Sequence, residues 1–121
     1  MEIQQVDFVS VATRDVGRAV AWYRDVLGLP VSAFADCEVE APNVTLSFWN
    51  PEQHGERFVA NESGVAFRVA DVGAAVDEAR AAGAEVIGID DTGVCHMGFV
   101  RDPDGNVLIL HHRYAERVKR G

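Results

Sequence analysis

The chain has 121 residues, of which 48% are hydrophobic and 25% charged, a size and composition typical of one soluble globular domain. Its 19 acidic and 11 basic residues give a formal net charge of −8, and this charge would repel nucleic acid and anionic membranes. No apolar run approaches the roughly 20 residues that span a bilayer. The opening MEIQQVDF lacks the basic and apolar regions of a secretory signal. The two cysteines, Cys37 and Cys95, predict neither a disulfide framework nor a cysteine-based zinc site. We therefore expect a reduced, cytoplasmic protein that binds neither nucleic acid nor membranes.

The chain contains an internal repeat. The segment FVSVATRDVGRAV (8–20) aligns with GVAFRVADVGAAV (64–76), and within it 15–17 meets the identical tripeptide 71–73. Self-similarity of this kind predicts two copies of one structural unit, each about half of the chain. Within a single domain, the predicted boundaries are 1–52 for the first module, 53–63 for a polar linker and 64–121 for the second module.

Each copy predicts one strand, one helix and three further strands. Residues 8–13 and 64–69 alternate between two kinds of side chain, which is the period of a strand with two different faces. Asp15 and Asp71 stand where a helix N-cap is expected, and apolar residues follow each of them at helical spacing. The later strands are expected near 30–35, 37–41 and 43–49 in the first copy, and near 85–90, 94–101 and 106–112 in the second.

One face of each strand should cover the helix, and the other should point away from it. Val9 and Val11 suit the helix side, so Phe8 and Ser10 should point away. A face with aromatic walls and a few polar groups is what an organic ligand requires. The same parity assigns to these outer faces Thr45, Ser47, Trp49 and Arg68. A cation such as Arg68 needs a partner there, either a protein carboxylate or an anionic or carbonyl-bearing ligand.

The last predicted strand ends in two adjacent histidines and follows the turn DPDGN (102–106). Neighbouring strand residues point to opposite faces, so His111 and His112 cannot chelate one metal ion from a regular strand. Cys95 and His96 are also adjacent, and the sequence offers no third group to orient them as nucleophile and base.

Three motifs together resemble the vicinal oxygen chelate superfamily, which contains glyoxalase I, extradiol dioxygenases, fosfomycin-resistance enzymes and bleomycin-resistance proteins. They are DVGRAVAWYRDVLGL (15–29), DVGAAVDEARAAGAEV (71–86) and DPDGNVLIL (102–110). The resemblance extends from about Val6 to His111. It implies an α+β fold of two β-α-β-β-β modules, each a curled mixed sheet with one helix outside, that pair into a cupped half-barrel around a cavity.

The enzymes of this superfamily hold a divalent metal with His, Gln or Glu ligands from the first and last strands of each module. Carried over position by position, the resemblance puts these ligand positions at Phe8, Thr45, Gly64 and Ile109. Phe8, Gly64 and Ile109 offer no donor atom, and Thr45 alone is a poor ligand. The resemblance therefore implies a member that lacks the metal ligands, and we expect no cofactor.

We predict a metal-free protein that binds or sequesters an aromatic or anionic organic molecule in the cavity between the modules. Bleomycin-resistance proteins are the functional analogy, because they hold their ligand without chemistry. We also expect a homodimer, since family members of this length commonly pair. The predicted ligand-binding residues are Phe8, Ser10, Thr45, Ser47, Trp49, Arg68, Ile109 and His111.

Three alternatives stay open. A metal-dependent lyase, isomerase or dioxygenase of the same superfamily would need displaced ligands such as His96 and His111. A metal-independent enzyme would use Arg68 and a histidine as acid–base groups. A structural or regulatory dimer would bind no ligand.

Overall fold

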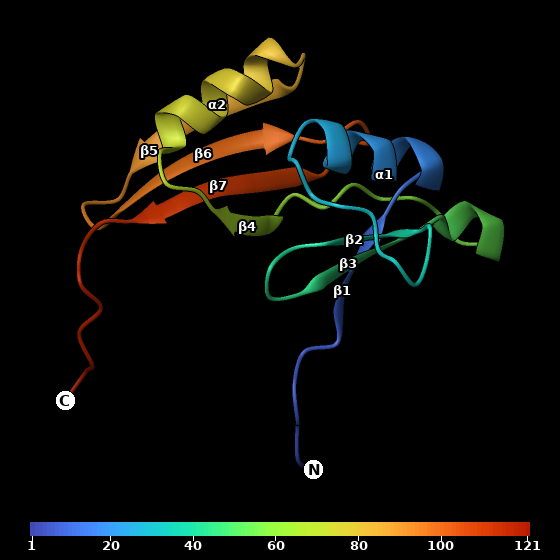
Figure 1. Cartoon of the computed structure of the whole chain (residues 1–121), viewed down its shortest axis with the longest axis horizontal. Helices are drawn as coiled ribbons and strands as arrows, with labels where there is room; N and C mark the ends of the chain where they lie inside the picture. Colours follow the sequence, from blue (N-terminus) through green and yellow to red (C-terminus); the bar gives the residue numbers. More distant parts are fainter. The chain divides into compact units, whose positions relative to one another are not determined.

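The computed structural model describes all 121 residues, which form two compact units, Met1–Ala60 and Asn61–Gly121. Each unit has one α-helix on one mixed β-sheet (Figure 1). Neither sheet closes into a barrel, and both α-helices, at ten residues, are too short to span a bilayer. The predicted α+β class is confirmed.

The first unit contains a three-stranded sheet in the order β1–β3–β2, with β1 parallel and β2 antiparallel to β3. The strand expected near 30–35 is only a bridge between Val31 and Val39. The chain turns away from the sheet here because the Ser32 hydroxyl accepts a hydrogen bond from the Phe34 amide. The elements of this unit are β1 (Phe8–Ala12), α1 (Val16–Asp25), β2 (Glu38–Glu40), β3 (Thr45–Trp49) and the 3-10 helix η1 (Pro51–His54).

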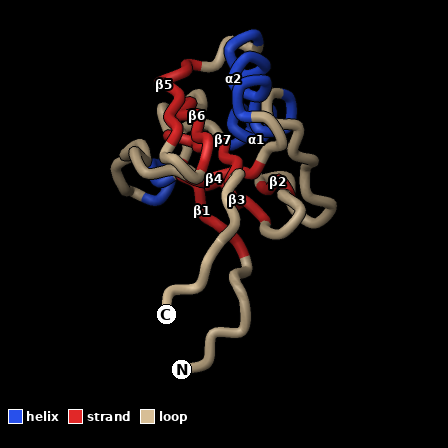
Figure 2. Tube along the Cα trace, turned by 90° about the vertical axis from the view of Figure 1, so that its left-hand side faces the viewer, coloured by secondary structure: helices blue, strands red, loops and turns tan.

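The second unit contains a four-stranded sheet in the order β4–β7–β6–β5. β4 is parallel to β7, and the remaining pairs are antiparallel. The helix α2 lies along one face of this sheet, over β5, β6 and β7 (Figures 1 and 2). The strand bounds agree with the predicted ones to within one residue. The elements are β4 (Val65–Arg68), α2 (Val72–Ala81), β5 (Glu85–Asp91), β6 (Cys95–Arg101) and β7 (Val107–Arg113).

Both helices begin at the aspartates that the sequence indicated. The Asp15 carboxylate accepts a hydrogen bond from the Arg18 amide, and the Asp71 carboxylate accepts one from the Ala74 amide, each at 3.0 Å. Each cap satisfies one of the amides that a helix start leaves without a partner. The two N-cap predictions are confirmed.

Strand alternation decides which face each helix covers. In the first unit Leu46 and Phe48 are buried, and Tyr23 of α1 packs edge-on against Phe48 with ring centroids 4.7 Å apart. In the second unit α2 lies so close to β6 that a Cβ atom at Gly98 would collide with Val76. Each helix therefore buries one sheet face, and the opposite face of each sheet has no helix on it.

Most of the polar stretch between the predicted modules, up to Ala60, belongs to the first unit. Asn50 caps η1 by accepting a hydrogen bond from the Glu52 amide. Phe58 is buried, and the Arg14 guanidinium lies 4.7 Å from its ring centroid. The polar composition of this stretch predicted a linker, but Phe58 within it is buried.

The turn at 102–106 forms the predicted β6–β7 hairpin and also holds a buried polar network. The Asp102 carboxylate accepts hydrogen bonds from the Asp104 amide and from both the amide and the side-chain nitrogen of Asn106, at 2.9 to 3.0 Å. The Asn106 side-chain oxygen accepts from the Asn61 amide at 2.9 Å. Asp102 and Asn106 are both buried, so this network fixes the first residue of the second unit onto its last hairpin.

We expect Asp102→Ala to lower the free energy of unfolding by about 2–4 kcal/mol, because three buried or partly buried donors lose their acceptor. Urea denaturation followed by circular dichroism measures this loss. Asp90→Ala is the matched control, since this carboxylate is exposed and its removal should cost less than about 0.5 kcal/mol. Equal losses in the two variants would contradict a structural role for the network.

Candidate functional site

The face of the first sheet that points away from α1 brings five predicted ligand-binding residues together. The β1–β3 register sets Phe8 opposite Thr45 and Ser10 opposite Ser47, with Trp49 at the end of the same face. Phe8 is 55% exposed and Trp49 36%, so both aromatic side chains reach solvent. The predicted orientation of these strands therefore matches the structure.

Strand β2 adds two glutamates to the same face, and neither was among the predicted ligand-binding residues. Glu40 stands opposite Thr45, and Glu38 stands opposite Ser47. The Thr45 hydroxyl donates a hydrogen bond to the Glu40 carboxylate at 2.6 Å, whereas Glu38 is half-buried and makes no hydrogen bond or ion pair. Their alternation around the buried Val39 places both glutamates on this face, as the period of two of a strand predicts.

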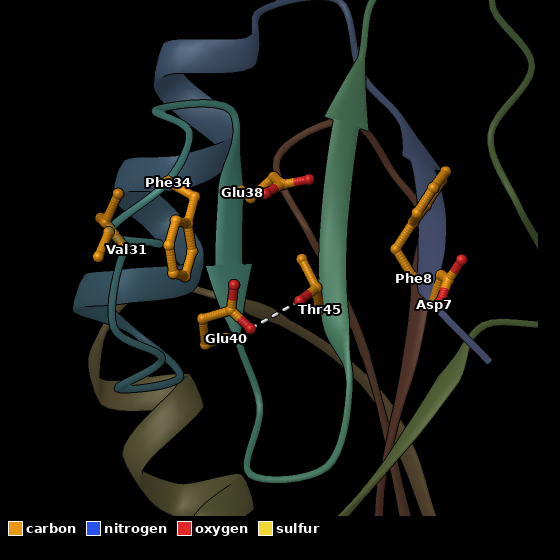
Figure 3. Close-up of a pocket in the computed structure, with 8 residues that line it drawn as sticks. Asp7, Phe8, Val31, Phe34, Glu38, Glu40 and Thr45 are labelled. Carbon is orange, nitrogen blue, oxygen red and sulfur yellow. Dashed lines mark hydrogen bonds between the residues drawn. The ribbon is translucent and has the colours of Figure 1, made fainter. Parts of the chain in front are cut away.

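A solvent-open pocket of about 470 Å³ lies on this part of the first unit, within the usual volume range of small-molecule sites. Figure 3 shows Phe34 and Val31 on one side of it, Phe8 on the other, and Glu38 and Glu40 between them. Phe34 lies in the loop before β2 and is 95% exposed. The full lining is Asp7, Phe8, Val31, Ala33, Phe34, Glu38, Glu40 and Thr45.

The second sheet also has an open face, with three further predicted residues on it. Arg68 stands opposite His111 and Ile109 opposite Phe99, while His111 also faces Met97. Arg68 is exposed and makes no hydrogen bond or ion pair, so it lacks the carboxylate partner considered from the sequence. The cavity between the modules stays a prediction.

The family model of the Glyoxalase/Bleomycin resistance protein/Dioxygenase superfamily matches residues 5–110. The chain belongs to this superfamily. No curated protein gave a significant match to the sequence.

Solved structures of superfamily members share the fold of this chain. Lactoylglutathione lyase from Agrobacterium tumefaciens is 19% identical over 91% of this chain and 94% of its own, with a TM-score of 0.72. A superfamily member from Sphaerobacter thermophilus is 17% identical over 90% and 97%, with a TM-score of 0.76. A superfamily enzyme from Burkholderia phytofirmans is 21% identical over 88% and 98%, with a TM-score of 0.73. Identities this low establish a common fold and carry no statement about substrate.

The residues at the superfamily's metal-ligand positions do not provide the donors that a metal ion needs in this chain. Of the four positions carried over by the resemblance, only Thr45 has a donor atom, and its hydroxyl donates to Glu40. Gly64 has a φ of +71°, and a Cβ atom there would collide with the Val107 carbonyl oxygen. No group of three or more His, Cys, Asp or Glu residues is arranged to hold a metal ion. We therefore derive no chemical step through a metal.

The displaced ligands considered from the sequence lie on opposite faces of the second sheet. His96 stands opposite His112 across β6 and β7, whereas His111 stands opposite Met97. Because adjacent strand positions point to opposite faces, His96 and His111 cannot bind one ion. Cys95 and His96 are divided in the same way, which excludes them as a nucleophile–base pair.

The second unit contains a cluster of titratable side chains, Asp91, His96 and Tyr114, that the sequence did not predict. The Asp91 carboxylate accepts hydrogen bonds from the Tyr114 hydroxyl at 2.7 Å and the Gly93 amide at 2.8 Å, and its second oxygen lies 3.4 Å from His96 Nε2. The Gly93 amide, followed by the Tyr114 hydroxyl, lowers the pKa of Asp91. The hydrogen bond to Asp91 in turn raises the pKa of Tyr114. The cluster attaches the start of the C-terminal segment to the β5–β6 hairpin.

We expect Gly64→Ala to lower the free energy of unfolding by about 2–4 kcal/mol. A left-handed backbone costs a side chain about 1–2 kcal/mol, and overpacking typically adds about 1–3 kcal/mol. Gly83→Ala is the control, because Gly83 also has a positive φ but open space around it. Urea denaturation of both variants should show the larger loss at Gly64, and equal losses would refute the steric argument.

We expect Tyr114→Phe to raise the pKa of Asp91 toward its ordinary value, with the Gly93 amide keeping it partly lowered. Because the folded-state pKa of Asp91 is depressed, its stabilising contribution is present above the unfolded-state pKa and is lost as the pH falls through the folded value. The opposite holds for Tyr114, whose raised pKa means that the interaction is lost as the pH rises through the folded value. An NMR titration of the side-chain carboxyl carbons measures the change. Asp25, whose pKa is lowered by Arg24, should titrate as before.

Proposed function

We propose that this superfamily member binds a small organic molecule without a metal ion, on the open face of its first sheet. The observation that carries the proposal is the pocket of about 470 Å³ with side chains from β1, β2 and β3 in one register. Three strands hold Phe8, Thr45 and the two glutamates in fixed positions, which reduces the conformational entropy lost when a ligand binds.

The pocket walls support an organic ligand. Phe8 and Phe34 are exposed to solvent, and covering their rings would remove apolar surface from water at roughly 25 cal/mol per Å². The Thr45 hydroxyl, which donates to Glu40, keeps lone pairs that can accept a hydrogen bond from a ligand. A rim of aromatic rings with a few oriented polar groups is the usual composition of such sites.

Binding without catalysis is the simplest function for this set of residues. The superfamily chemistry that depends on a metal needs several N or O donors, and the corresponding positions here are occupied by Phe8, Thr45, Gly64 and Ile109. The pocket also lacks histidine and cysteine, so no general base or nucleophile of those types contacts a ligand in it. We propose that the protein sequesters this ligand without chemistry and does so as a homodimer.

We expect organic ligands to raise the melting temperature of the protein equally with and without a chelator. A ligand at 100 times its Kd stabilises the native state by about 2.7 kcal/mol. Differential scanning fluorimetry with a panel of small aromatic compounds, in EDTA and in added Zn²⁺ or Mn²⁺, measures this shift. A shift that occurs only with metal would favour the metal-dependent lyase, isomerase or dioxygenase instead.

Phe8→Ala should reduce that ligand-induced shift while leaving the unliganded melting temperature nearly unchanged, because Phe8 is largely exposed. Val59→Ala is the control, since Val59 is exposed in the same unit and does not line the pocket. A ligand shift that survives unchanged in Phe8→Ala would overturn the assignment of the site.

A further inference from the structure

We infer that the pocket of the first unit selects an organic cation, an amine with an aromatic or alkyl body. This inference rests on the proposed function and specifies the class of its ligand. It differs from the expectation drawn from the sequence, which named an aromatic or anionic molecule.

The charged side chains that line the pocket are all negative, which favours a cationic ligand. Its lining contains the carboxylates of Asp7, Glu38 and Glu40 and no lysine, arginine or histidine. The hydrogen bonds to these carboxylates come from neutral donors, the Gln5 amide to Asp7 and the Thr45 hydroxyl to Glu40. An anionic ligand would add a fourth negative group to this pocket, whereas a cation would neutralise part of its charge.

The spacing of the two glutamates is the second argument. Glu38 and Glu40 lie two residues apart on one face of β2, so their Cα atoms are separated by roughly 6.6–6.8 Å. An ammonium group placed between the two carboxylates would be attracted to both of them. It has three donors, enough to reach both glutamates, and Glu38 has no competing partner.

The aromatic walls are the third argument, and they separate an organic cation from a simple metal ion. Phe34 and Phe8 flank the carboxylates from opposite sides (Figure 3). Ring faces attract cations within about 6 Å, and the rings also offer apolar surface that only a carbon-bearing ligand can cover. A metal ion would instead need three or more suitably arranged protein donors, and no such group is present.

The ligands for the test share one aromatic body and differ in charge: 2-phenylethylamine, 2-phenylethanol and 3-phenylpropionate. Titrations of the full-length protein followed by ¹H–¹⁵N NMR give affinities in the weak range expected for fragments and identify the residues that respond. We expect the amine to bind about tenfold more tightly than the alcohol, with shifts at Phe8, Phe34 and Glu38. We expect the propionate to bind more weakly than both, and added salt to weaken the amine alone.

Glu38→Gln should weaken binding of the amine several-fold and leave binding of the alcohol unchanged. Glu56→Gln is the matched control, because it makes the same change in net charge at an exposed residue outside the pocket. Amine binding should be equal in Glu56→Gln and the unmodified protein. An equal effect of both substitutions would attribute the preference to overall charge and overturn the assignment to the pocket.

The outcomes distinguish this inference from the proposed function. If amine and alcohol bind equally well at Phe8 and Phe34, cation selection is wrong and small-molecule binding stands. If none of the three compounds shifts these residues, while the wider panel stabilises the protein elsewhere, both the pocket and its selectivity are wrong. Preference for the propionate would restore the anionic ligand expected from the sequence.

Discussion

Each sheet of this protein has a single helix, and the rest of the structure follows from that constraint. One helix can bury only one face of a sheet, so the period-two alternation of the strands must place the large apolar residues on that face. Leu46 and Phe48 satisfy this requirement in the first unit, and Leu108 and Leu110 satisfy it in the second. The opposite faces have no helix on them, and they carry aromatic, hydroxyl and charged side chains.

The elements that local chemistry specifies could be predicted from the sequence. Aspartate caps and strand parity depend on residues only a few positions apart, so Asp15, Asp71 and the orientation of Phe8 followed directly from the pattern. The register between strands could not be read from the pattern. It is the β2–β3 pairing, which the sequence does not specify, that brings Glu38 and Glu40 beside Ser47 and Thr45.

The features that sequence reasoning missed depend on contacts between distant residues. Asp91 and Tyr114 are 23 positions apart, and nothing local to either residue predicts their hydrogen bond. The exposure of Phe34 reflects a turn that ends the pairing begun at Val31, where a full strand was expected near 30–35. In both cases a loop or terminal segment, rather than a regular element, decides the environment of the side chain.

Phe8 and Gly64, which stand at equivalent positions of the two copies of the repeat, differ in the space around them. At Phe8 the backbone is a regular strand on an open face, so another side chain could stand there without conflict. At the equivalent position of the second copy, Gly64 occupies a left-handed conformation directly against the Val107 carbonyl, so that no side chain fits unless the backbone moves. A metal-binding side chain could therefore be introduced at position 8, but not at position 64 without a shift of the backbone. At Gly64 the close approach of the backbone to Val107 leaves no room for a side chain, whereas Phe8 stands beside Thr45 with its ring exposed. The two copies of the repeat therefore present different side chains on their open faces. The pocket with its aromatic rings and carboxylates lies on the first copy, and Arg68 and His111 lie on the second.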